Sequence, residues 1–313
     1  MKKIVYVCDY SFLKNKMNQQ AYQKCMALVE QDNIMLVDIK RGEQRDAVEI
    51  QKEYKCDLII QEHIQPKFPL QLYNLDKVTC ETAMILGDMH ELPNKITTQD
   101  FVDKIKPWKH ILHMFDTPRL DELKKLCPNV HFHRLSMHID TNIYKDYKLE
   151  KIYDVLIYGA MNEKYYPFRL RLKNILLNSD LNIKYIPEPS YSNRDKSNVI
   201  RGVELAKLIN QSWLTVCTCS NVEYLVLKYL EIPACKSIPI GNVPTRDKVF
   251  ESVVTQLDES ESDEELLHDI KDLLLNKSKM IFELEKNKSF IDSSYGMNSF
   301  VKKVNDFAEG VCK

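Results

Sequence analysis

Short apolar runs alternate with longer helical patterns along the whole chain, and this alternation constrains the fold most. Residues 2–9 and 34–39 read KKIVYVCD and IMLVDI, and the apolar positions between them, in 17–31, have helical spacing. Strands that alternate with helices form βαβ units, in which helices cover a parallel sheet. We expect further strands at 56–63, 83–90, 110–116, 131–137, 154–159, 182–187, 213–219 and 238–241. Further helices are expected at 167–179, 199–212, 221–237, within 258–276 and at 298–309.

The alternation is interrupted at 142–152, where the polar sequence NIYKDYKLEKI separates two series of strands and helices. A chain of 313 residues is long enough for two domains. We therefore expect an α/β fold with two Rossmann-like domains, over residues 1–148 and 149–292. The last segment, 293–313, is expected to form a helix that packs back on the first domain.

Composition argues against several classes of protein. The formal net charge is −1, whereas proteins that coat nucleic acid carry a basic excess, so we expect no nucleic-acid partner. No run approaches the ~20 apolar residues of a membrane span, and the apolar run at 4–8 is too short for a signal peptide. The nine cysteines include no Cys-x-x-Cys pair, which favours a reduced, cytoplasmic chain. The seven glycines form no Gly-x-Gly-x-x-Gly cluster, which argues against a nicotinamide dehydrogenase.

Two glutamates give the strongest local signal for a binding site. Glu223 and Glu231 are eight residues apart in the helix expected at 221–237, so their carboxylates would share one face. A carboxylate near the carboxyl ends of parallel strands can accept two hydrogen bonds from a ribose diol. From the spacing alone, a solvent-exposed pair of glutamates on an amphipathic helix explains the pattern at least as well.

The segment 221–241 resembles the donor-binding stretch of GT-B glycosyltransferases, which has two glutamates, a small-residue turn and a Pro-hydrophobic pair. Glu223 and Glu231 match the glutamates, while Ala234-Cys235 and Pro239-Ile240 match the two later features. The resemblance implies that Glu231 holds the ribose hydroxyls and that Glu223 lies near the transferred sugar and the phosphates. Lys236 stands where the family usually has glycine, and it could bring a further cation to the phosphates.

A second segment, 153–172, resembles the first strand, turn and helix of a GT-B donor domain, especially in family 4-like and spore-protein-like glycosyltransferases. Gly159 would let the backbone approach a diphosphate closely, and Arg169 could bind a phosphate through two hydrogen bonds. Lys228 is a further candidate for the phosphates, and a salt bridge with Glu231 three residues later is the alternative. Arg171 is interpreted as a surface residue.

The first half of the chain carries weaker signals. His90 follows the strand expected at 83–90, and the resemblance implies that it faces the sugar, where a histidine could act as a general base. Asp9 follows the first strand and would bind or activate an acceptor hydroxyl, or cap the next helix. His131 and His133 alternate along one strand without a matching carboxylate motif, so we expect no metal site.

These features together predict a glycosyltransferase that moves a sugar from a UDP or GDP donor to an acceptor hydroxyl. The acceptor would be a glycan, a lipid-linked molecule or a protein. The resemblance implies two domains that face each other across a cleft, retention of the anomeric configuration, and no cofactor or obligatory metal. Two alternatives stay open, a non-catalytic module that binds a nucleotide-sugar or a partner protein, and a sugar-nucleotide epimerase of the same architecture.

Overall fold

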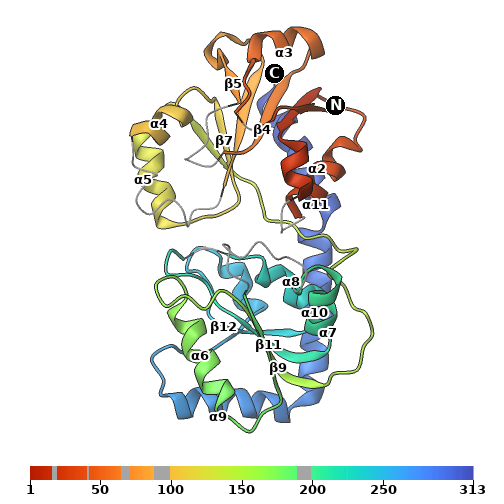
Figure 1. Cartoon of the computed structure of the whole chain (residues 1–313), viewed down its shortest axis with the longest axis vertical. Helices are drawn as coiled ribbons and strands as arrows, with labels where there is room; N and C mark the ends of the chain where they lie inside the picture. The colour runs from red at the N-terminus through yellow and green to blue at the C-terminus, as the bar shows by residue number, and fades with distance from the viewer. Residues whose placement is uncertain are drawn as a thin grey trace. The chain divides into compact units, whose positions relative to one another are not determined.

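The computed structural model describes residues 1–15, 20–40, 42–64, 71–87, 99–188, 199–223 and 225–312. The chain forms two compact units (Figure 1). Unit 1 comprises Met1–His138 and Met297–Lys313, and unit 2 comprises Ile139–Gly296. The second unit therefore begins ten residues before the position expected from the sequence, because Ile139 already pairs with Gly296. No helix among the described residues is long and apolar enough to cross a membrane.

Unit 1 is built on a parallel sheet of six strands in the order β2-β1-β4-β6-β7-β8. β1 (Ile4–Cys8) and β4 (Leu58–Ile64) are interior strands of this sheet, and every side chain of β1 is buried. Continuous apolar runs of this kind suit a parallel sheet that is covered on both faces. The remaining strands of this sheet are β2 (Ile34–Asp38), β6 (Glu81–Leu86), β7 (His110–His113) and β8 (His131–Arg134).

Helices α2 (Gln20–Val29) and α11 (Met297–Val311) pack side by side on one face of this sheet (Figure 1). Phe300 and Val304 of α11 join the core that Ile4, Tyr6 and Leu58 form on that face. The end of the chain thus completes the first unit. The other face carries α4 (Gln99–Ile105) and α5 (Pro118–Leu126), and the smaller elements are α1 (Tyr10–Asn15), β3 (Arg45–Asp46), α3 (Ala47–Tyr54), β5 (Leu72–Tyr73) and η1 (Leu75–Lys77).

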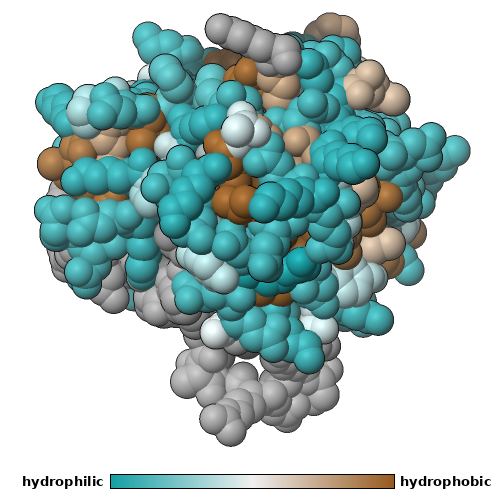
Figure 2. All heavy atoms as spheres, turned by 90° about the horizontal axis from the view of Figure 1, so that it is seen from above, coloured by the Kyte–Doolittle hydropathy of each residue, from teal (hydrophilic) through white to brown (hydrophobic). Residues whose placement is uncertain are grey.

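The surface drawn in Figure 2 is mainly hydrophilic. Its hydrophobic residues form small, separate areas among the described residues, as expected for a folded surface exposed to water.

Unit 2 is built on a parallel sheet of five strands in the order β10-β9-β11-β12-β13. Its core consists of aliphatic side chains from β9, β11 and β12, packed against the helices that follow in the chain. The strands are β9 (Tyr153–Gly159), β10 (Ile183–Pro187), β11 (Ser212–Cys217), β12 (Ile238–Gly241) and β13 (Thr255–Gln256).

Four helices of unit 2 pack in two pairs. α6 (Pro167–Leu177) packs with α9 (Asp263–Leu275), whereas α10 (Lys277–Tyr295) packs with α8 (Lys228–Ala234) and with β12. α9 starts at a capping box, in which the side chains of Ser262 and Glu265 each accept a backbone hydrogen bond from the other residue. The remaining elements are α7 (Val203–Asn210) and η3 (Lys248–Ser252).

Helices α1, α3 and α4 and the short strands β3, β5 and β13 were not expected from the sequence, and three further differences concern longer segments. The helix expected at 221–237 spans only Lys228–Ala234, because the residues before it form a loop in which Glu223 has a positive φ of 50°. The strand expected at 83–90 ends at Leu86, and residues 88–98 lie outside the described part of the chain. Helix α10 was not expected at all, because its polar residues are spread around the helix and leave no clear apolar stripe.

Candidate functional site

The candidate site lies at the carboxyl edge of the sheet in unit 2. β9 ends at Gly159, while β11 and β12 end at Cys217 and Gly241, which are paired in register. In open parallel sheets, ligands bind outside the carboxyl ends of the strands. Of the side chains predicted to bind the donor, Arg169 reaches this edge from α6, and Lys228 and Glu231 reach it from α8.

Gly159 occupies a backbone conformation that only glycine adopts easily. Its φ is +87°, and a Cβ atom built on it would lie 2.8 Å from Nζ of Lys228 and 3.7 Å from a terminal nitrogen of Arg169. The glycine therefore serves two purposes, the turn out of β9 and the close approach of two cationic side chains to the backbone. These three predicted donor-site residues are brought together by the fold.

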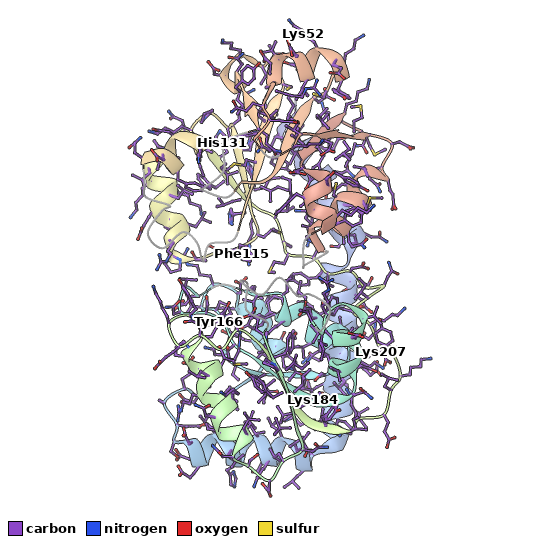
Figure 3. The ribbon with its side chains drawn as sticks, in the orientation of Figure 1. Lys52, Phe115, His131, Tyr166, Lys184 and Lys207 are labelled. Carbon is purple, nitrogen blue, oxygen red and sulfur yellow. The ribbon has the colours of Figure 1, made fainter. Side chains whose placement is uncertain are left out.

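Arg169 is almost completely buried, with 2% of its surface exposed. Its Nε donates to Oγ1 of Thr218 at 3.2 Å, and its terminal nitrogens donate to the carbonyls of Thr218 at 2.7 Å and Ala160 at 3.2 Å. Its guanidinium also lies 3.9 Å from the ring centre of Tyr166, which Figure 3 labels at the start of α6. The charged group is thus fixed in place by the loops that follow β9 and β11.

Lys228 is buried at the start of α8. Its ammonium donates to the backbone carbonyl oxygen of Tyr158 and lies 3.6 Å from the centre of the Tyr158 ring. Burial holds the pKa of Lys228 well below its usual range, and the nearby charge of Arg169 lowers it further. The salt bridge with Glu231 considered from the sequence does not form, because both side chains turn to Tyr158 instead.

Neither cation forms an ion pair with another described residue, although the more distant charges of Glu188 and Glu231 act on Lys228. Within the described residues, no carboxylate oxygen lies within 4.0 Å of either Arg169 or Lys228. Buried charges are unfavourable unless they are paired, and polar carbonyl groups compensate only in part. An anionic ligand bound beside Arg169 and Lys228 would therefore offset the unfavourable burial of these two cations.

Glu231 lies one turn along α8 from Lys228 and is also buried. Its Oε2 accepts a hydrogen bond of 2.8 Å from the hydroxyl of Tyr158, and Tyr144 forms a second hydrogen bond with the carboxylate. Burial raises the pKa of Glu231, while these two hydrogen bonds partly oppose the shift. The carboxylate predicted to hold a ribose is therefore present at the site, with two tyrosine hydroxyls bound to it.

Glu223 does not share a helix face with Glu231, which corrects the argument from spacing. It lies in the loop before α8 with φ +50°, and its Oε2 accepts a hydrogen bond of 2.5 Å from Thr245. A non-glycine residue in this region of φ and ψ is strained by about 1–3 kcal/mol, and such residues are frequent at functional sites. Its place at the carboxyl edge thus comes from the loop and not from helical periodicity.

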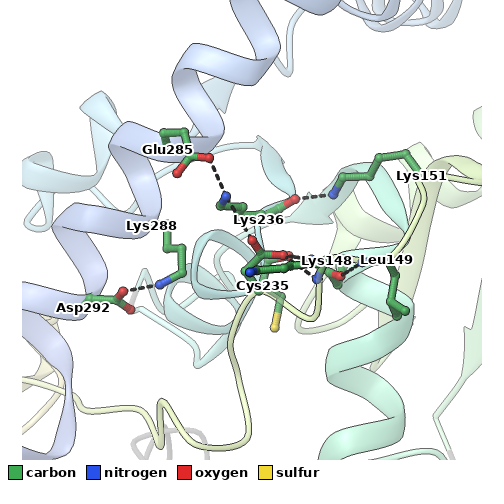
Figure 4. A network of polar contacts seen from close by, with 10 residues as sticks. Lys148, Leu149, Lys151, Cys235, Lys236, Glu285, Lys288 and Asp292 are labelled. Atoms are coloured by element: carbon green, nitrogen blue, oxygen red, sulfur yellow. Dashed lines mark hydrogen bonds and ion pairs between the residues drawn. The ribbon is translucent and has the colours of Figure 1, made fainter.

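Lys236 occupies the turn between α8 and β12 with φ +53°, a value that favours glycine (Figure 4). Its ammonium lies 3.0 Å from Oδ2 of Asp146 and also pairs with Glu285 of α10. Its own carbonyl accepts a hydrogen bond from Lys151. The side chain therefore ties the turn to two other segments of unit 2.

The structure gives less information about the two predicted site residues of unit 1, Asp9 and His90. Oδ1 of Asp9 accepts a hydrogen bond of 2.8 Å from the backbone N–H of Phe12, so this carboxylate caps the turn that opens α1. His90 lies outside the described residues, and the structure gives no position for it. A buried ion pair that the sequence analysis did not single out joins Lys24 to Glu62 at 2.5 Å. Nothing in the spacing of Lys24 and Glu62 marks them as partners, because they come from different elements.

His133, one of the two histidines considered for a metal, belongs to a hydrogen-bonded chain with His110 and Glu81. His110 lies 3.0 Å from both Glu81 and His133, through its two ring nitrogens. In the part of the chain that the structure describes, no three or more His, Cys, Asp or Glu side chains are placed to hold a metal ion.

Comparisons with known proteins identify the architecture. The structure matches sucrose-phosphate synthase from Thermosynechococcus elongatus with a TM-score of 0.62 at 8% identity, over 99% of both chains. It matches Anabaena Alr3699/HepE in complex with UDP with a TM-score of 0.62 at 10% identity, over 99% of this chain and 100% of the other. The fold is GT-B. T4 phage beta-glucosyltransferase is a further GT-B match, with a TM-score of 0.56 at 11% identity over 99% of both chains.

These structural similarities place the chain in the GT-B fold, the architecture expected from the sequence. No family model matches the sequence, and a search of curated proteins finds no match. The fold of unit 2, with the predicted donor residues at the carboxyl edge of its sheet, is therefore the basis for the functional argument.

Proposed function

We propose that the protein is a glycosyltransferase that binds a nucleotide-diphosphate sugar at the carboxyl edge of unit 2. The observation that carries this proposal is a pair of buried cations, Arg169 and Lys228, which both lie close to Gly159. Among the described residues, neither has a carboxylate partner within 4.0 Å. A diphosphate supplies the missing negative charge. Fold alone does not establish activity, so the proposal depends on these side chains.

Transfer breaks the bond between the anomeric carbon and the diphosphate oxygen, and the diphosphate leaves with the electron pair. The acceptor hydroxyl forms the new bond to the anomeric carbon on the face that the diphosphate leaves, and its proton passes to the departing diphosphate oxygen. Arg169, already fixed by Thr218 and Tyr166, would stabilise the charge that develops on the leaving group. Lys228 would join it, because a neighbouring anion raises the depressed pKa of this amine and favours its charged form.

The other donor residues are assigned by their positions. Glu231 would exchange its hydrogen bond with Tyr158 for the hydroxyls of the ribose. Glu223, strained in the loop before α8, would lie near the sugar, as the resemblance implies. Lys236 is held by Asp146 and Glu285, so we assign it to the stability of its turn and not to phosphate binding.

We propose UDP-glucose as the donor to be tested first. Anabaena HepE, which shares the fold, has been solved with UDP and with UDP-glucose. We further propose retention of the anomeric configuration, from the Glu223–Glu231 pattern, and transfer without an obligatory metal, from the two protein cations. We also propose a cytoplasmic location, as expected from the scattered cysteines of the sequence.

Calorimetric titration with UDP and UDP-glucose, with and without EDTA, tests donor binding. We expect Lys228→Met to weaken UDP binding by about 10- to 100-fold, the range for a lost charged hydrogen bond of about 1.5–3 kcal/mol. Lys173→Met is the matched control, because Lys173 lies on α6 with its ammonium beside Tyr185. Equal affinity of a folded Lys228→Met variant and the wild type would exclude a role for this amine.

Turnover is tested separately by release of UDP from UDP-glucose, with and without glycan acceptors. An NMR assignment of the new linkage distinguishes retention from inversion. Tight binding of UDP-glucose without any release of UDP would favour the non-catalytic nucleotide-sugar module instead.

A further inference from the structure

A groove of about 560 Å³ lies in unit 2, and the donor residues do not line it. It is bordered by η3 and β13 on one side and by α9 and α10 on the other. Its volume falls within the range of ordinary ligand sites. Its floor is apolar and includes the buried side chains of Val253, Val254, Leu257 and Met280.

The groove exposes one edge of the sheet. β13 is the last strand in the order of the sheet as described, and it pairs only with β12. The N–H of Leu257 donates to Gly241 of β12 at 2.8 Å. Because backbone groups alternate sides along a strand, the N–H and C=O of Gln256 point away from β12 toward the groove. The carbonyls of Ser252 and Val253 are already bound by Lys286 and Asn287 of α10.

The charges around the groove are unequal. Four carboxylates line it, against the two ammonium groups of Lys279 and Lys286. Lys286 is paired at 3.0 Å with Glu283, which leaves the acidic side chains in excess. The four carboxylates belong to Glu251, Asp269, Asp272 and Glu283.

Large apolar side chains are exposed next to the groove. Leu275, the last residue of α9, is 83% exposed and precedes Asn276, which lines the groove. Phe282 of α10 is 68% exposed and lies on the same helix face as Lys279 and Lys286, three residues before it and four after it. Exposed apolar residues gathered beside a hollow are typical of protein-binding surfaces.

We propose that this groove binds an extended, basic segment of a partner protein, which adds to β13 as a further strand. Alternate residues of such a segment would place apolar side chains on the floor and lysine or arginine side chains against the carboxylates. The backbone of Gln256 would supply hydrogen bonds, as in other cases of strand addition. The charge excess and the free strand edge both favour this occupant, and neither depends on the function proposed for the donor site.

The test is fluorescence anisotropy with a fluorescein-labelled hexapeptide of alternating lysine and valine, added to the full-length chain. Peptides that alternate lysine with serine, or glutamate with valine, probe the apolar floor and the charge separately. We expect the lysine–valine peptide to bind at least 10-fold more tightly than either. Failure of this peptide to bind, or equal affinity for all three peptides, would overturn the proposal.

Two variants connect binding to the groove. The double variant Asp269→Asn, Asp272→Asn should bind the lysine–valine peptide about 10-fold more weakly. The control double variant Glu163→Gln, Glu264→Gln removes the same charge outside the groove and should keep the wild-type affinity. Gln256→Pro removes the N–H that points away from β12 and keeps the pairing with it, so it should abolish strand addition. Thermal melting confirms that each variant is folded. Unchanged peptide affinity in both folded variants would show that the peptide binds elsewhere.

Discussion

Replacing Gly159 by alanine tests the centre of the proposed donor site. Glycine at φ +87° is unstrained, whereas an L-residue in the left-handed region is less stable by about 1–2 kcal/mol. The new Cβ would also lie 2.8 Å from Nζ and 3.0 Å from Cε of Lys228. Lys228 would have to move and give up its hydrogen bond to Tyr158, a loss of about 0.5–1.5 kcal/mol. We therefore expect Gly159→Ala to lower the free energy of unfolding by about 1.5–3.5 kcal/mol.

Two other glycines separate strain from crowding. Gly42 has φ +86° and Gly202 has φ +55°, and neither would place a Cβ within 4 Å of another atom. Alanine at either position should therefore show only the cost of strain. Urea unfolding of the three variants measures the differences, with the slope of free energy against urea checked for constancy.

The same variants should differ more clearly in ligand binding. Gly159→Ala displaces Lys228 and fills the space where the backbone would approach a diphosphate, so we expect UDP affinity to fall at least 10-fold. Gly42→Ala and Gly202→Ala should leave it unchanged. If all three variants lose the same stability and keep wild-type affinity for UDP, the packing argument for Gly159 is wrong.

Two further predictions concern buried charges in unit 1. Burial lowers the pKa of His113 to about 4, so between pH 6.5 and 4 the unfolded chain binds more protons. Stability should therefore fall by up to about 3 kcal/mol over this range in urea unfolding, and His113→Asn should remove the effect. Lys24→Met leaves the Glu62 carboxylate without its ion-pair partner and should lower stability by about 3–5 kcal/mol. Because burial raises the pKa of Glu62 to about 8, thermal melting should show that Lys24→Met loses more stability at pH 8 than at pH 5.5. Equal losses of stability at the two pH values would contradict the ion pair between Lys24 and Glu62.

The sequence alone determined the ten longer strands and most of the helices, but not the two-residue strands β3, β5 and β13. Runs such as 34–39 are apolar and rich in branched side chains, which suit a parallel sheet covered on both faces, and β2 lies there. The start of α9 at Ser262 was also predictable, because a capping box is a local interaction within four residues. These features depend on neighbours in the chain, and the order of strands and helices was enough to predict the α/β fold.

Helical spacing did not predict where α8 begins. Glu223 and Glu231 have helical spacing, but the positive φ at Glu223 places the first of them in a loop. Helix α10 was missed because its sequence has no apolar stripe, although its packing against α8 and β12 stabilises it. Local propensity is weak compared with such tertiary contacts.

The chemistry of the candidate site was decided only by the tertiary structure. The sequence singled out Gly159, Arg169, Lys228 and Glu231 one by one, through their resemblance to a family. Tyr158 connects two of them, accepting from Lys228 with its carbonyl and donating to Glu231 with its hydroxyl, and no spacing in the sequence indicates this. The partners are brought together by parallel strands and their crossover helices, over about 70 residues of sequence. Arg169 and Lys228 become buried side by side, where an anion could pair with both, only once these segments have packed.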